Sequence, residues 1–328
     1  MTESSTAIRR LIDNAGHVLV VGHASPDGDC IGAVLALGHT LSRLGKGRTL
    51  VLPDPIAAYL DFLPGSGEVL IAPPTLPPAD LAIVPDCSDL ERLGSLYADH
   101  AALLDAIPLI NIDHHVSNRL FGQINVVDQG AAAVCEQLFF LLPALDVSID
   151  LAIATCLLTG LVTDTQAFRT PSTTPRSLKV AGALMEVGAP LTEIADQVYH
   201  SKPLATLRLW GLALSQLEEA GGVIWTQLNE EMLRQSGASW HDSEALVSLL
   251  SSVHSAHAAL LFKEMPGGVV RVSLRSAGKV NVAAVAEQFG GGGHLGAAGC
   301  SLSAPLPVAK KLVVSRVQES LAALPSDN

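Results

Sequence analysis

Acidic and histidine side chains gather at four places in the first half of the chain. The segments that carry them are HASPDGD with His23, Asp27 and Asp29, LAIVPD with Asp86, DHH with Asp113, His114 and His115, and TDTQAF with Asp164. Carboxylate and imidazole groups hold divalent cations and move protons in catalysis. The residue types therefore point to a metal centre or to acid–base chemistry, provided that the fold brings the four places together.

The elements around these segments predict such a meeting point. Apolar segments predict buried strands at 17–22, 48–52, 81–86 and 107–113, and helical patterns fill about 31–44, 131–142, 150–162 and 175–187. Strands that alternate with helices predict an α/β fold with a doubly wound, mostly parallel sheet, whose ligands bind outside the carboxyl ends of the strands. Since a strand turns successive side chains to opposite faces, the DHH residues can share one site only where their strand ends.

Each segment also has an ordinary structural explanation. Pro-Asp-Gly is common in turns, and an aspartate such as Asp86 or Asp164 often caps a helix. All four explanations would have to coincide at one edge of the sheet, so we favour a metal centre. Converging carboxylates repel one another unless they take up protons, and the charges of two divalent cations balance those of four aspartates. Two histidines with four carboxylates favour Mn²⁺, with Mg²⁺, Co²⁺ or Fe²⁺ as alternatives.

Composition limits the function classes. The chain has 328 residues, of which 48% are hydrophobic and 16% charged, and its net charge is −12. This acidity argues against binding of long duplex nucleic acid and suits a short anionic ligand. The sequence has no apolar run of the roughly 18 residues that a membrane-spanning helix needs. Five cysteines without metal-type spacing predict reduced thiols and a cytoplasmic protein, and apolar helices near residue 191 suggest a homodimer.

The pattern divides the chain into three parts. We expect a metal-binding catalytic domain at 1–190, a helical linker at 191–221 and a smaller α/β domain at 222–328. The linker pattern is helical to residue 219 and shows no strand. The last part predicts strands at VIWTQL, AALLFKEM and VVRVSLRS, with helices at about 241–252, 281–288 and 306–322. We expect the active-site cleft to lie between the first domain and the last.

A glycine-rich segment, FGGGGHLGAAG, stands in the last domain. Backbone N–H groups without side chains can cradle a phosphate or a carboxylate, so Gly291, Gly292, Gly293 and His294 are predicted to hold the far end of a substrate. Arg275 is a candidate phosphate clamp through its fork of donors. A flexible linker and a solvated strand arginine are the corresponding ordinary explanations.

Taken in order, the four segments resemble the motifs of the DHH phosphoesterase superfamily, and FGGGGHLGAAG resembles the signature of its DHH-associated C-terminal domain. The layout is similar to that of short-chain members that degrade nanoRNA and dephosphorylate 3′-phosphoadenosine 5′-phosphate (pAp). The resemblance implies one metal ion on His23, Asp27 and Asp86, and a second on Asp29, Asp86, His114 and Asp164. It implies that His115 contacts the scissile phosphate and that Asp113 orients its neighbours. This sequence departs from the family pattern at Ala33, usually Ser, and at Gln166, commonly Gly.

The expected function is therefore a two-metal phosphohydrolase that cleaves nanoRNA to nucleoside monophosphates and removes the 3′-phosphate of pAp. A phosphodiesterase for cyclic dinucleotides or for the linear dinucleotide pApA is the alternative enzyme. A nucleotide-binding regulator is the alternative outside enzymes. The presence of every predicted metal ligand argues against the regulator.

Overall fold

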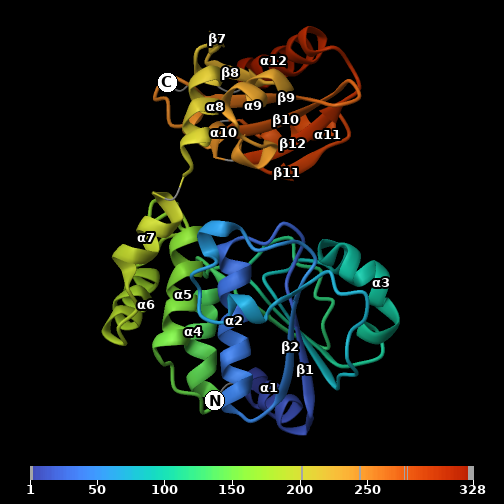
Figure 1. Cartoon of the computed structure of the whole chain (residues 1–328), viewed down its shortest axis with the longest axis vertical. Coiled ribbons are helices and arrows are strands. Elements are labelled where there is room, and N and C mark those ends of the chain that lie inside the picture. The colour runs from blue at the N-terminus through green and yellow to red at the C-terminus, as the bar shows by residue number, and fades with distance from the viewer. Residues whose placement is uncertain (1–2, 201, 244, 277, 279, 324–328) are drawn as a thin grey trace. The chain divides into compact units, whose positions relative to one another are not determined.

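The computed structural model describes residues 3–200, 202–243, 245–276, 278 and 280–323, and the chain forms two compact units, residues 1–201 and 202–328 (Figure 1). Each unit contains one six-stranded sheet. None of the helices in the described part of the chain combines the length and the hydrophobicity that crossing a membrane requires.

The first unit alternates strands with helices. Its strands are β1 (His17–Val21), β2 (Gly47–Leu52), β3 (Leu70–Ile71), β4 (Leu81–Pro85), β5 (Leu109–Asp113) and β6 (Ile124–Val127). Its helices are α1 (Glu3–Asn14), α2 (Gly28–Arg43), α3 (Ser95–Leu104), α4 (Val134–Ala144), α5 (Leu151–Asp164), α6 (Pro175–Glu186) and α7 (Leu191–Tyr199). Short 3₁₀ turns are η1 (Ala58–Leu60), η2 (Ser66–Glu68) and η3 (Leu90–Leu93).

The strand order of this sheet is β3-β2-β1-β4-β5-β6, and all neighbours run parallel. The chain moves outward from β1 through β2 to β3, then returns to place β4, β5 and β6 on the other side of β1. The order therefore reverses between β1 and β4, and such a switch point opens a crevice at the carboxyl ends of the strands. The predicted doubly wound parallel sheet is confirmed.

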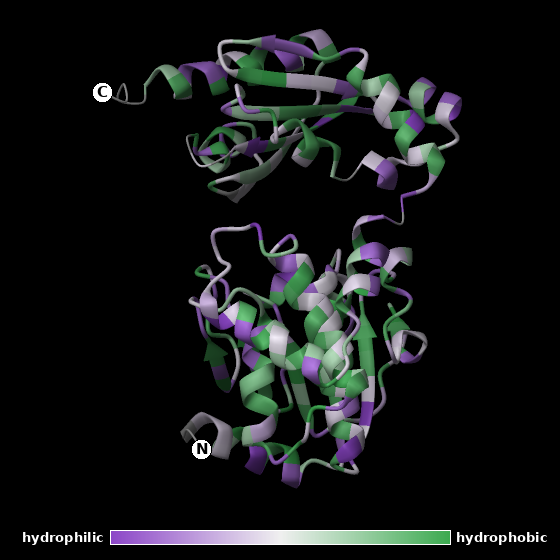
Figure 2. Cartoon of the chain, turned by 90° about the vertical axis from the view of Figure 1, so that its left-hand side faces the viewer, coloured by the Kyte–Doolittle hydropathy of each residue, from purple (hydrophilic) through white to green (hydrophobic). Residues whose placement is uncertain are grey.

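Both faces of this sheet are buried, which explains the nearly continuous apolar runs of its strands. Val18 and Val20 of β1 pack into the core formed with α1, α2, α4 and α5, whereas Leu19 and Val21 pack into the core with α3 and η3. Figure 2 shows hydrophobic residues along the strands of this unit and hydrophilic residues on its loops and outer helix surfaces.

The second unit is a smaller α/β structure. Its strands are β7 (Glu218–Ala220), β8 (Val223–Leu228), β9 (Ala258–Met265), β10 (Val269–Ser276), β11 (Gly292–His294) and β12 (Ala297–Leu302). Its helices are α8 (Leu204–Leu214), α9 (Glu230–Ser236), α10 (Leu246–Leu250), α11 (Val282–Glu287) and α12 (Leu306–Ala322), with the 3₁₀ turn η4 (Trp240–Ser243). The strand order is β11-β12-β10-β9-β8-β7, in which only the β8–β9 pair is parallel among the described strands.

The segment expected to be helical up to residue 219 differs from that prediction. Helix α7 packs against α5 of the first unit, whereas α8 packs against α9 of the second. Residues Glu218–Ala220 form the edge strand β7, so the prediction of no strand was wrong. Gly221 and Gly222 both have positive φ, 56° and 76°, as a two-residue hairpin turn requires, and this turn pairs the short exposed strand with β8.

Candidate metal centre

The connection between β1 and α2 places three of the predicted side chains. His23 follows the end of β1 and is buried. Asp27 caps α2, because its Oδ1 accepts hydrogen bonds from the N–H groups of Asp29 at 3.1 Å and Cys30 at 3.0 Å. Capping occupies one carboxylate oxygen and leaves the second oxygen free to bind a cation. Asp29, in the first turn of α2, is 1% exposed.

Asp86 lies at the switch point, directly after β4. Its N–H continues the sheet by donating to the carbonyl of Ile112 at 2.8 Å, and its φ of 57° then turns the chain into the left-handed region. The carboxylate is 2% exposed, with Oδ2 3.3 Å from Nε2 of His23. Backbone strain of this kind in a non-glycine residue is typical of functional sites.

The end of β5 supplies the histidines. Nδ1 of His114 lies 3.2 Å from the carbonyl oxygen of Ala131, and its Nε2 lies 3.6 Å from Oδ1 of Asp86. The same Nε2 is 3.5 Å from Oδ2 of Asp164, the last residue of α5. Nδ1 of His115 lies 2.7 Å from Oδ1 of Asp113 and 3.6 Å from Oδ1 of Asp86.

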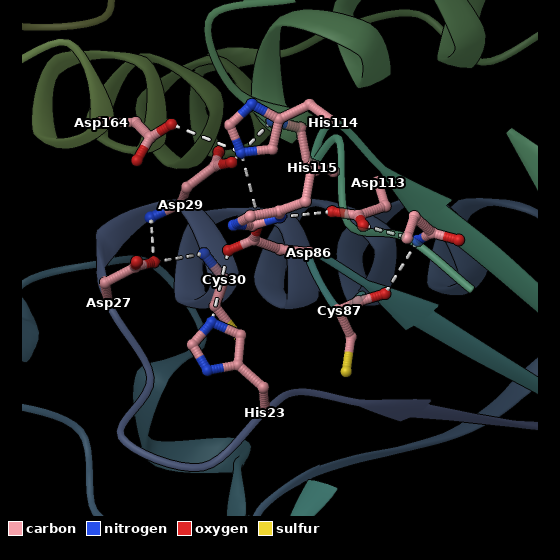
Figure 3. A network of polar contacts seen from close by, with 12 residues as sticks. His23, Asp27, Asp29, Cys30, Asp86, Cys87, Asp113, His114, His115 and Asp164 are labelled. Atoms are coloured by element: carbon pink, nitrogen blue, oxygen red, sulfur yellow. Dashed lines mark hydrogen bonds and ion pairs between the residues drawn. The ribbon is translucent and has the colours of Figure 1, made fainter. Parts of the chain in front are cut away.

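These side chains form one cluster whose members point toward a common centre (Figure 3). Three sets each offer ligand atoms within 4.8 Å of one another: His23, Asp27 and Asp86; Asp29, His114 and Asp164; and Asp86, His114 and His115. Asp86 and His114 each belong to two sets, so the three sets are connected through shared residues. The four separate segments of the sequence thus meet at the carboxyl edge of the parallel sheet.

Two family models match the chain in the regions that hold these features. The model of the DHH family, N-terminal domain, matches residues 17–161, and that of the DHHA1 domain matches residues 221–323. A bifunctional oligoribonuclease and PAP phosphatase NrnA from Thermus thermophilus is 34% identical to this chain, and the match covers 93% of this chain and 90% of the relative. The chain belongs to the DHH family. The resemblance carried by the sequence motifs is confirmed.

Two further matches extend over most of the chain. A crystal structure of an exopolyphosphatase-related protein from Bacteroides fragilis superposes with a TM-score of 0.92 at 25% identity, covering 98% of this chain and 99% of that one. A cyclic-di-AMP phosphodiesterase PdeA from Listeria monocytogenes is 25% identical over 95% of this chain, which corresponds to 49% of the relative. The two-unit organisation is therefore shared with a solved structure.

The donor set of this DHH chain fits divalent cations. Oδ1 of Asp86 is buried and has no hydrogen-bond partner among the described residues, although an unpaired buried carboxylate oxygen is costly. The nearest imidazole nitrogens, on His114 and His115, both lie 3.6 Å away, which is too long for a hydrogen bond. Such a separation suits two ligands of one ion, whose bonds to nitrogen and oxygen are about 2.0–2.2 Å long.

Without a cation, the cluster of this DHH chain holds protons. Burial and the neighbouring Asp86 raise the pKa of Asp29 to about 7, and burial and Asp29 raise the pKa of Asp164 to about 8. Burial would lower the pKa of His114, but the carboxylates of Asp86, Asp29 and Asp164 outweigh it and raise the pKa to about 10. A metal ion that binds here must displace protons.

The predicted substrate residues lie in the sheet of the second unit. Gly292 and Gly293 belong to β11, which pairs with β12, and Gly291 precedes it. A side chain at Gly291 or Gly293 would meet a carbonyl oxygen of β12 at 2.1 or 2.4 Å, so close strand packing alone requires both glycines. Gly292 has nothing within 4 Å of the place where a Cβ would lie.

Arg275 of β10 lies in the same register row as His294 of β11, with Ala297 of β12 between them. The side chain of His294 lies outside the described part of the structure. The guanidinium of Arg275 is half-buried, which lowers its pKa, and its Nη1 donates to the carbonyl of Leu274 at 3.0 Å. No carboxylate in the described residues forms an ion pair with it. A half-buried cation without an anionic partner suits an anionic ligand.

Several supporting contacts are not evident from the motifs. Nδ2 of Asn118 donates to Oδ2 of Asp113 at 2.5 Å and to Oδ1 of Asn111 at 2.8 Å. The backbone N–H groups of Val134 and Cys135 donate to the two carboxylate oxygens of Asp29, at 2.6 and 2.9 Å. Of these supporting residues only Asn118 could have been suspected from the sequence, because a polar side chain so near the end of the strand has partners close by. Backbone donors leave no mark in a sequence.

Proposed function

We propose that this chain is a metal-dependent phosphohydrolase that cleaves short RNA oligonucleotides to nucleoside monophosphates and removes the 3′-phosphate of pAp. The observation that carries the proposal is the buried Asp86 carboxylate, whose unpaired Oδ1 faces His114 and His115 while its Oδ2 faces His23. The name of the Thermus thermophilus relative supplies the two substrate classes.

In this proposal, His23, Asp27 and Asp86 hold one divalent cation, and Asp29, Asp86, His114 and Asp164 hold the second. The mixed carboxylate and imidazole ligands favour Mn²⁺, with Mg²⁺, Co²⁺ or Fe²⁺ as alternatives. When bound, such a pair polarises the phosphoryl oxygens and neutralises the charge that develops on them during displacement.

His115 is the residue proposed to contact the scissile phosphate. Asp113 binds its Nδ1 at 2.7 Å and thereby sets the orientation of the ring and the nitrogen that carries its proton. Asn118 holds Asp113 in turn, so the imidazole is placed before a substrate arrives. An oriented imidazole can donate to the leaving oxygen as the ester bond breaks.

The second unit is proposed to hold the part of the substrate that does not react. Arg275 would pair with a phosphate, and the backbone of Gly291, Gly292, Gly293 and His294 would lie along the base or ribose. The open space at Gly292 supports this assignment, as does the guanidinium of Arg275, which has a backbone carbonyl but no carboxylate as a partner among the described residues. In this proposal residues 1–190 carry the chemistry, and residues 222–328 select a short substrate.

A phosphodiesterase for cyclic dinucleotides or pApA is the second candidate, favoured by the match to PdeA.

The five cysteines are free and buried, which supports the proposed cytoplasmic location. The homodimer remains a prediction from the sequence.

Parallel turnover assays test the proposed function. The purified protein is incubated with Mn²⁺ and either pAp, pApA, cyclic di-AMP or RNAs of two to ten nucleotides, and nucleotide products are measured. We expect release of monophosphates from the shortest RNAs and of phosphate from pAp, and loss of both in Asp86→Ala. Faster turnover of cyclic di-AMP or pApA would favour the second candidate. Binding of these ligands without turnover would identify a regulator.

A further inference from the structure

Arg176 lies in the first turn of α6, outside the cluster, and joins two carboxylates of the first unit. Its Nε donates to Oε1 of Glu136, and its Nη2 donates to Oδ2 of Asp128 at 2.9 Å. The guanidinium also lies over the ring of Phe140, 5.8 Å from the ring centroid. These contacts fix the guanidinium in one place although its side chain is 39% exposed.

Glu136 is the buried partner. It is 0% exposed and stands in the first turn of α4. Its Oε2 accepts from Ser177 Oγ at 3.0 Å and from the backbone N–H of Ala132 at 2.9 Å. Arg176 and Ser177 of α6 therefore give each oxygen of a buried carboxylate a donor, and this carboxylate in turn holds the backbone ahead of α4 through Ala132.

The backbone held in this way runs from Asp128 to Cys135, here called the 128–135 segment. Arg176 binds its beginning at Asp128, and Glu136 follows its end. Within it, the carbonyl oxygen of Ala131 lies 3.2 Å from Nδ1 of His114. At its end, the N–H groups of Val134 and Cys135 donate to Asp29 at 2.6 and 2.9 Å.

We propose that Arg176, acting with Glu136, is a positioning residue for the metal centre. By fixing both ends of the 128–135 segment, it sets the orientation of His114 and Asp29, which are two proposed ligands of one cation. The inference rests on the proposed function in that it assumes this cluster binds metal. Residues that orient metal ligands from outside the ligand set contribute about 10–100-fold to metal affinity or activity.

A purely structural role for the same pair predicts a different result. If Arg176 only joined α6 to α4, its loss would lower the stability of the unit and leave metal affinity unchanged once the protein is folded. Metal affinity measured without substrate therefore separates the two roles. It is also independent of any step in catalysis.

The experiment measures Mn²⁺ binding by calorimetry in the metal-free full-length protein, with the melting temperature recorded in parallel. The variants are Arg176→Ala, Arg176→Lys and the double variant Arg176→Met with Glu136→Gln, in which no buried charge is left without a partner. Arg43→Ala is the matched control, because Arg43 is 40% exposed and pairs with Asp150 without touching the 128–135 segment.

We expect the dissociation constant of at least one Mn²⁺ to rise about 10–100-fold in Arg176→Ala and in the folded double variant. Arg176→Lys, which can reach one carboxylate but not both, should recover part of the affinity. Arg43→Ala should bind Mn²⁺ as the wild type does. Wild-type affinity in the folded double variant would overturn the proposal. Absence of Mn²⁺ binding in the wild type would instead refute the proposed function.

Discussion

Asp27, Asp29 and Asp86 each make a structural contact in addition to their proposed place in the metal centre. Asp27 caps α2, Asp29 accepts from the backbone at the start of α4, and Asp86 continues the β4–β5 pairing through its N–H. These contacts fix the carboxylates before any cation binds, and at Asp29 and Asp86 they do so at the expense of burying charge. Preorganisation of this kind lowers the entropy that ordering the ligands would cost.

The orientation of His115 by Asp113 leads to a prediction about rate. Asp113→Asn keeps the shape of the side chain but replaces the acceptor that fixes the His115 ring, so turnover of pAp should fall about 10–100-fold. Mn²⁺ binding measured by calorimetry should remain close to that of the wild type. Asp80→Asn is the control, because Asp80 accepts hydrogen bonds from the backbone N–H groups of Gly16 and His17 at the amino ends of the strands, away from the cluster. Equal turnover in Asp113→Asn and wild type would contradict this role.

The protons held by the metal-free cluster predict a dependence of metal affinity on pH. Asp29 and Asp164, with pKa values raised to about 7 and about 8, are partly protonated near neutrality and must lose protons to bind a cation. Mn²⁺ affinity should therefore rise with pH between pH 6 and 8, by about tenfold per pH unit for each proton released. Calorimetry in two buffers of different ionisation enthalpy measures the proton release. An affinity that is constant over this range would contradict the prediction.

The sequence allowed the residue types of the cluster to be predicted, because aspartate and histidine stand at the ends of recognisable strands. It could not show how they are held. The carbonyl of Ala131 and the N–H groups of Val134 and Cys135 belong to an apolar segment whose side chains carry no polar signal. Glu136 and Arg176 are 40 positions apart, and no local pattern connects them.

At the scale of elements, the position of Asp29 depends on the close packing of α2 against α5. Glycines on both helices permit this approach: a Cβ at Gly32 of α2 would lie 2.5 Å from the carbonyl oxygen of Cys156. A Cβ at Gly160 of α5 would lie 2.3 Å from Sγ of Cys135 and 2.7 Å from Oδ1 of Asp29. The helix pair therefore leaves no room for a methyl group beside the metal centre.

Gly160→Ala should lower the free energy of unfolding by about 1–3 kcal/mol, the usual cost of overpacking, and should also weaken Mn²⁺ binding. Gly182→Ala in α6 is the matched control, because nothing lies within 4 Å of its Cβ position. That substitution should raise the free energy of unfolding by about 0.5–1 kcal/mol, since alanine suits a helix better than glycine. Denaturant unfolding measures both values, and equal effects of the two substitutions would refute the packing argument.

Elements with strong periodicity or long apolar runs were predictable, and the others were not. The buried strands β1, β2, β4 and β5 follow from runs of apolar residues, and α2 and α5 from helical patterns. The strands β3 and β7 have two and three residues, all exposed, so they are too short to show a strand pattern and form by pairing with a neighbour. Their existence depends on tertiary structure that a local pattern does not contain.

One further element departs from local preference. Gln166, Ala167 and Phe168, directly after α5, all have positive φ, 48°, 58° and 62°. This conformation costs roughly 1–2 kcal/mol for each non-glycine residue, and it follows the cluster residue Asp164. According to the sequence resemblance, the family commonly has a glycine at position 166. The left-handed backbone of this residue explains why a glycine suits the position.

At the scale of the whole molecule, the two units divide the proposed work. The parallel sheet of the first unit collects the metal ligands at one edge, whereas the mostly antiparallel sheet of the second carries Arg275 on β10, with β12 between it and the glycine-rich strand β11. With a net charge of −12 the molecule as a whole repels polyanions. A positively charged side chain such as Arg275 would offset this repulsion where the substrate binds.

Arg275→Ala should therefore affect substrate affinity rather than metal binding. Loss of a charge-assisted hydrogen bond of about 1.5–3 kcal/mol should raise the KM for an RNA dinucleotide about tenfold or more, with Mn²⁺ affinity unchanged. Arg271→Ala is the control, because Arg271 lies on the same strand and the same face and is exposed. Steady-state kinetics distinguish the two. An unchanged KM in Arg275→Ala would remove this residue from the substrate site.

The most direct test of the account is anomalous diffraction at the manganese edge from crystals of the full chain grown with Mn²⁺. We expect two manganese peaks for each molecule, one bonded to His23 and one to His114, with the Asp86 carboxylate bonded to both. Manganese found only away from Asp86, or no manganese at all in crystals of a protein that hydrolyses pAp, would contradict the proposed metal centre.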